Sequence, residues 1–78
     1  MKYALIIANP NSDELGRIVS RHRTLLAGGQ SLSKLNNSRW AYVAERRTDG
    51  GYPLRCERNA EETTEAARYE WQRQEQMR

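Results

Sequence analysis

Residues 24–35 read TLLAGGQSLSKL, with leucines at helical spacing on both sides of Gly28-Gly29-Gln30. In one interpretation a helix spans 13–27 and ends at the two glycines, because glycine is common just past a helix end. In the other, GRIVSRHR (16–23) is a strand and a helix begins with Thr24 as its N-cap. The second interpretation places both glycines inside the helix, at a cost of about 2 kcal/mol relative to alanine.

A comparison within the chain favours the second interpretation. A shift of 35 residues aligns four pairs: Gly16 with Gly51, Val19 with Leu54, Arg23 with Arg58, and Thr24 with Asn59. Such a pattern is typical of a β-hairpin-helix unit used twice. We therefore predict one α+β domain over residues 1–78 in the order ββαββα, a four-stranded antiparallel sheet with two helices on one face. The order βαββα is the alternative. In the favoured order, Gly28 lets the first helix approach the sheet closely.

The flanking segments supply the other elements. KYALIIA (2–8) reads as a strand that ends at the turn formers NPNSD (9–13). RWAYVAERR (39–47), TDGG (48–51) and YPLRCER (52–58) read as a hairpin, in which Gly50 accepts the positive φ that such turns require. A final helix is expected from Asn59 as N-cap, with Glu62 at the capping-box position. Its predicted buried stripe comprises Ala60, Thr64, Ala67 and Trp71.

Composition limits what this domain can be. Twelve Leu, Ile and Val residues and no Phe make a thin core in 78 residues, so stability gained from a partner or a homodimer is expected. The net charge is +3, yet residues 1–59 carry ten Lys and Arg against five Asp and Glu, whereas 60–78 carry three against five. Cys56 is the single cysteine, which excludes an internal disulfide. No apolar run is long enough to span a bilayer, so we expect a cytoplasmic protein without a membrane partner.

The stretch AGGQSLSKLNN (27–37) resembles the Gly-Gly-Gln loop of peptide release factors and ribosome-rescue hydrolases. Leu32, Ser33 and Lys34 match the aliphatic, small polar and basic residues that follow the tripeptide in those families. The resemblance implies that Gln30 helps to place the water that hydrolyses peptidyl-tRNA. The apolar lead-in at 25–27 and the acidic tail depart from the family pattern, and a structural role for the glycines is the favoured interpretation.

No other pattern indicates catalysis, and no cofactor or metal is expected. His22 is the only histidine and has no partner ligand at a metal-binding spacing. Cys56 fits a small core position. Glu61, Glu62 and Glu65 stand where acids complement a helix N-terminus. We therefore predict that the protein is not an enzyme.

Arginines interleaved with aromatics form the more informative pattern. In a strand, alternate residues face alike, so Arg17, Arg21 and Arg23 are predicted to share one side. If Ala41 and Val43 face the helices, Trp40 and Tyr42 lie on the open face of the sheet, where aromatics beside arginines could stack on single-stranded nucleic acid. The opposite orientation buries both aromatics. The candidate binding residues are Arg17, Arg21, Arg23, Arg39, Trp40, Tyr42, Arg46 and Arg47.

Two functions fit this pattern. A hairpin followed by a helix, with arginines on the hairpin, is similar in topology to integrase arm-binding domains, which implies a small basic module that docks on nucleic acid. Alternatively, a small phage or mobile-element protein could bind and inhibit a larger host complex, as anti-CRISPR proteins do, because Arg and Trp are favoured interface anchors. The placement of Glu14, Glu45, Asp49 and Glu57 discriminates the two, since acids beside the arginines would repel phosphate.

Overall fold

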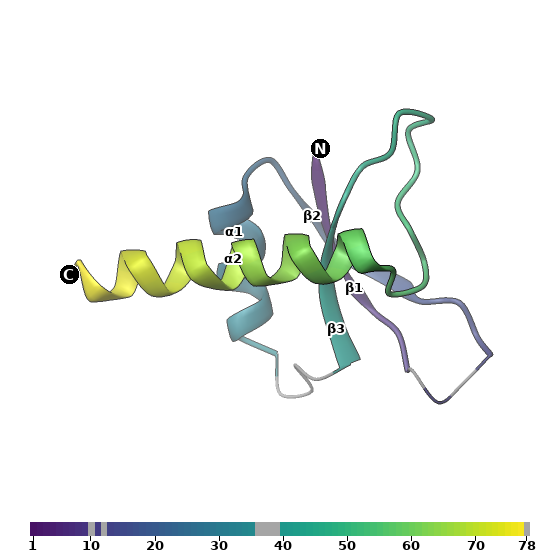
Figure 1. Ribbon diagram of the computed structural model, residues 1–78, viewed down its shortest axis with the longest axis horizontal. Coiled ribbons are helices and arrows are strands. Elements are labelled where there is room, and N and C mark those ends of the chain that lie inside the picture. Colours follow the sequence, from purple (N-terminus) through teal and green to yellow (C-terminus); the bar gives the residue numbers. More distant parts are fainter. Residues whose placement is uncertain (10, 12, 36–39, 78) are drawn as a thin grey trace.

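The protein forms a three-stranded antiparallel sheet with two helices (Figure 1). The structure is a computed structural model, of which residues 1–9, 11, 13–35 and 40–77 are described here. The elements follow in the order β1 (Tyr3–Ile7), β2 (Arg17–His22), α1 (Leu25–Ser33), β3 (Ala41–Glu45) and α2 (Arg58–Gln76). An α+β fold with a helix after the second strand is therefore confirmed. The alternative order βαββα is wrong, because 17–22 is a strand.

The strand order β2-β1-β3 places the most apolar strand in the centre. Ala4, Leu5 and Ile6 of β1 are almost completely buried, because both outer strands pair with β1 and both of its faces are covered. β2 and β3 are each antiparallel to β1 and hence parallel to one another. Helix α1 connects them, which makes β2-α1-β3 a β-α-β unit split by β1.

The two glycines of α1 account for its position. The helix begins with Thr24 as N-cap, whose Oγ1 accepts from the Ala27 N–H at 3.1 Å, as the sequence predicts. A Cβ at Gly28 would lie 3.1 Å from Val43 Cγ1, so this glycine lets α1 approach β3 closely. A Cβ at Gly29 would lie 2.2 Å from the backbone oxygen of Ala67. Gly29 is therefore the position at which α1 and α2 touch backbone to backbone.

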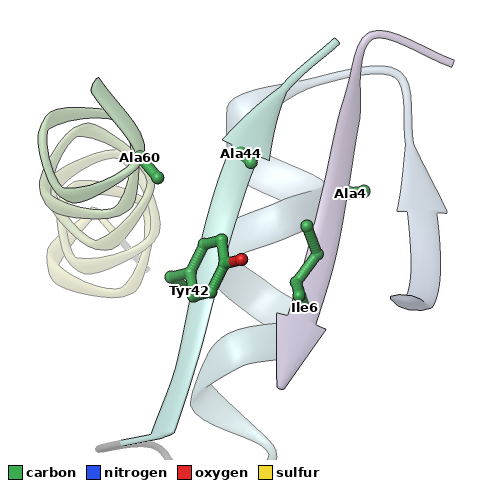
Figure 2. Packing of buried hydrophobic residues seen from close by; sticks show 5 residues of the cluster. All are labelled: Ala4, Ile6, Tyr42, Ala44 and Ala60. Carbon is green, nitrogen blue, oxygen red and sulfur yellow. The ribbon is translucent and has the colours of Figure 1, made fainter. Parts of the chain in front are cut away.

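Helix α2 crosses the free edge of β3 from one face of the sheet to the other, and the predicted placement of both helices on one face is wrong. Figure 2 shows α2 beside β3, with Ala60 next to Ala44. Farther along α2, Ala67 packs with Leu5 and Val43, which lie on the α1 side of the sheet. Between them, the Thr64 hydroxyl accepts from the Val43 N–H at 2.9 Å and lies 3.2 Å from the Val43 carbonyl oxygen. The hydroxyl lies closer to the Ala60 carbonyl oxygen, at 2.7 Å, so what the helix side chain supplies to β3 is an acceptor for a backbone N–H that a fourth strand would otherwise pair with.

The predicted fourth strand is absent: residues 51–57 form no strand. This segment instead crosses the sheet face opposite α1, where Tyr52 packs against the cluster of Ala4, Ile6 and Tyr42. The Leu54 carbonyl accepts from the Gly16 N–H at 2.6 Å, which ties the segment to the chain just before β2. Pro53, which is buried here, has no N–H to give to a strand ladder. The consequence is a sheet covered on both faces.

The last helix starts earlier than the sequence predicts. Its N-cap is Glu57, without a side-chain capping bond, and not Asn59. The buried stripe of Ala60, Thr64 and Ala67 is confirmed, and Trp71 is half-buried. The C-terminal part of α2 projects past α1 and beyond the sheet (Figure 1). Within the described residues, no helix is long and apolar enough to cross a membrane.

Candidate binding edge

The predicted stacking surface does not form around Tyr42. Ala41 and Val43 do face α1, so Tyr42 lies on the opposite face, as the alternation requires. That face is covered by residues 52–54, and only 3% of Tyr42 is exposed. Its hydroxyl donates to the Pro53 carbonyl at 2.7 Å, and burial raises the pKa of Tyr42 to about 12. Trp40 is half-buried just before β3. Tyr42 cannot stack on a base without unfolding this region.

Arg46 and Arg47 lie among acids. The Arg47 guanidinium donates to Glu57 at 2.8 Å, and Lys2 pairs with Glu45 at 3.5 Å. A cleft of about 360 Å³ beside them is lined by residues of both charges: Glu45, Arg46, Arg47, Pro53, Glu57, Asn59, Ala60, Glu62 and Thr63. The mixed charge makes this a poor phosphate surface. Arg39 lies outside the described residues.

The remaining predicted arginines lie together at the opposite edge of the sheet. Arg17 and Arg21 belong to β2, and Arg23 follows in the bend before α1. All three are exposed. Among the described residues, no carboxylate lies within ion-pair distance of any of them, whereas Lys2, Arg47 and Arg58 are all paired. We call Arg17, Arg21 and Arg23, with the outer side of β2, the basic edge.

The prediction that these arginines share one side of the strand is wrong, because β2 contains a β-bulge. Ser20 pairs with Leu5 but Ile18 pairs with Ile6, so Val19 is an extra residue in β2. On the N-terminal side of the bulge in β2, Arg17 pairs with Ile7. On its C-terminal side, Arg21 pairs with Ala4. Paired residues share a face, and Ile7 and Ala4 are on opposite faces of β1. Arg17 therefore lies on the α1 side of the sheet and Arg21 on the other.

Two of the four acids that discriminate the two predicted functions lie away from the basic edge. Glu45 ends β3, and Asp49 accepts from the Gly51 N–H at 2.9 Å in the turn that follows. Glu57 caps the start of α2. β1 separates Glu45 and Asp49 from β2, whereas Glu57 lines a cleft together with Leu15 and Glu14 is exposed three residues before Arg17. The basic edge is thus the most uniformly positive of the candidate surfaces.

A Ser–His contact escaped the sequence analysis. Ser20 Oγ and His22 Nε2 lie 2.8 Å apart, and their i,i+2 spacing in a strand was the available signal. Burial lowers the pKa of His22, because desolvation disfavours the charged imidazolium. In the part of the chain that the structure describes, no carboxylate hydrogen-bonds to His22. The pair lacks, within those residues, the orienting acid of a catalytic triad.

The other candidate chemistry has simple structural explanations. The Gly-Gly-Gln stretch lies within α1 with both glycines buried, so the flexible exposed loop that the release-factor resemblance implies is not formed. Cys56 is exposed, so its predicted core position is wrong. Partial desolvation, and secondarily Glu61, raises the pKa of its thiol, which is the opposite of an activated thiol. The described residues contain no group of His, Cys, Asp and Glu that could hold a metal ion.

Comparison with protein-family models, with curated proteins and with solved structures finds no match to this chain.

Proposed function

We propose that this protein is a non-enzymatic binding module that docks on the phosphate backbone of nucleic acid through Arg17, Arg21 and Arg23. The observation that carries the proposal is the grouping of these arginines. Three exposed guanidinium groups lie along one edge of the sheet, and among the described residues no carboxylate lies within 4.0 Å of any of them, the distance at which Lys2, Arg47 and Arg58 are paired. Arginine contacts phosphate with two parallel hydrogen bonds. A row of such groups supplies the sequence-independent part of nucleic-acid binding.

The test is fluorescence anisotropy of labelled duplex and single-stranded oligonucleotides as salt is titrated. Three phosphate contacts predict that log Kobs falls against log salt with a slope of about −2.7 for a duplex. The variant Arg17→Gln/Arg21→Gln/Arg23→Gln should bind at least tenfold more weakly at about 50 mM salt, with a slope near zero. Arg58→Gln/Arg68→Gln/Arg73→Gln on α2 is the matched control, since it changes the net charge equally.

Binding that both triple variants weaken equally would refute the proposed site, because net charge alone would then explain it. No binding of the natural chain to either oligonucleotide would refute the proposal altogether.

A second candidate function is inhibition of a larger protein through strand addition. One observation favours it: no strand of the described residues pairs with the outer side of β2, where Val19 is 45% exposed. Unpaired strand edges accept strands from partner chains. The bulge and the arginines count against it, since these features blunt edge pairing. Capture of a protein partner whose activity falls on binding, with both effects abolished by Val19→Pro and with no nucleic-acid binding, would support this function.

A further inference from the structure

We infer that the nucleic acid is a B-form duplex and that the basic edge enters its major groove, with Arg17 and Arg21 contacting phosphates on the two opposite walls. This inference rests on the proposed function and specifies its ligand. It starts from the bulge at Val19, which places Arg17 and Arg21 on opposite faces of the sheet. A strand with arginines on one face could cover one row of phosphates. A strand with arginines on both faces can reach two rows.

The position of β2 fits such an insertion. β2 is one of the two outer strands, and α2 crosses the free edge of the other, β3. Figure 2 shows α1 behind the sheet and α2 beside β3. The major groove is about 12 Å wide and admits a two-stranded β-ribbon. Two arginine side chains that extend from opposite faces of one strand span a similar width.

The bulge also supplies a group for the floor of the groove. Val19 is the unpaired residue between the two arginines and is 45% exposed although apolar. Apolar side chains at this depth contact the methyl group of thymine. Arg23, in the bend just after β2, adds a phosphate contact farther along the same edge.

Two other ligand classes fit less well. Single-stranded binding uses aromatic side chains beside the cations, but Tyr42 is buried on the strand farthest from β2. Double-stranded RNA has a deep and narrow major groove that side chains cannot enter. B-form DNA is the ligand that matches arginines on both faces of an edge strand.

The experiment compares the natural chain on one duplex DNA, its separated strands and the RNA duplex of the same sequence, at equal salt. We expect the DNA duplex to bind at least tenfold more tightly than either alternative. Methyl green, which occupies the major groove, should displace the protein, and netropsin, which occupies the minor groove, should not. Arg17→Gln and Arg21→Gln should each reduce the salt slope by about 0.9, whereas Arg68→Gln on α2, the control, should leave it unchanged.

The failure of this inference is distinguishable from that of the proposed function. Equal binding of single strands and duplex, still lost in the triple variant of the basic edge, would overturn the groove insertion and leave nucleic-acid docking intact. Displacement by netropsin and not by methyl green would have the same meaning. If the natural chain bound none of these nucleic acids, both the groove insertion and the proposed function would be refuted.

Discussion

At the scale of single residues, Gly29 is the position on which the packing depends most. Gly29→Ala would place a methyl group 2.2 Å from the Ala67 carbonyl oxygen, and a backbone atom cannot turn aside as a side chain can. Separating α1 from α2 should cost about 1–3 kcal/mol, although alanine has the higher helix propensity. The measurement is the free energy of unfolding in urea. A Gly29→Ala variant as stable as the natural chain would contradict the close approach.

Gly51→Ala is the matched control, because a Cβ there would meet only Asp49 Oδ1, at 3.4 Å. Its free energy of unfolding should change by less than about 0.5 kcal/mol.

Thr64 is the second decisive residue, because one hydroxyl serves both a helix and a strand edge. Thr64→Val keeps the volume but leaves the buried Val43 N–H without its 2.9 Å acceptor. An unsatisfied buried donor costs about 1–3 kcal/mol, and urea unfolding should register that loss. Thr63→Val is the control, since among the described residues the Thr63 hydroxyl donates only to the Asn59 carbonyl of its own helix. Equal effects of the two substitutions would show that Thr64 does not close the edge of β3.

At the scale of elements, the segment after β3 is secured by Tyr42. The pKa of its hydroxyl is raised to about 12, above the ordinary value of about 10 in the unfolded chain. Between these pH values the unfolded chain loses the proton and the folded chain keeps it. Stability is therefore fully present below pH 10 and falls as the pH rises toward 12, by about 2–3 kcal/mol.

Tyr42→Phe tests this directly by urea unfolding at a series of alkaline pH values. The variant should be less stable at pH 7 by about 1 kcal/mol, since the bond to Pro53 is lost. Its stability should also fall less steeply from pH 10 to 12. A natural chain and a variant with the same alkaline slope would mean that Tyr42 titrates normally.

The elements that could be predicted from sequence are those with local signals. Thr24 marks the start of α1 because its side chain caps the helix, and the run at 3–7 is apolar enough to be the central strand. No local signal in the sequence shows that residues 52–58 do not form a fourth strand. Its absence depends on Thr64, which is distant in sequence from β3 and occupies that edge. The alternation of residues along β3 correctly predicted that Tyr42 lies on the face opposite Ala41 and Val43. It could not predict that residues 52–54 fold over that face, because this contact depends on tertiary structure.

The bulge shows the same limit within the candidate site. The arginines were found by composition, and three of the eight predicted residues form the basic edge. Their sides were predicted wrongly, because strict alternation holds only while each residue of β2 opposes one of β1. The extra Val19 shifts that register, and nothing in the local sequence marks it.

At the scale of the whole molecule, the two outer strands of the sheet differ in what covers their free edges. The free edge of β3 is covered by α2. The positive charges of Arg46 and Arg47, which follow β3, are balanced by nearby acids. β2 presents arginines without described partners on an edge that no other described element covers. The acidic helix α2 lies at the far side of the sheet from β2. This separation gives a protein of modest net charge one surface suited to phosphate.

Chemical-shift perturbation tests this account most directly. The amide resonances of the isotope-labelled chain would be followed while a short DNA duplex is added at low salt. The account predicts shifts concentrated at 17–23, with residues 58–76 of α2 unchanged. Shifts concentrated on α2 or around 46–51, with 17–23 unchanged, would contradict it.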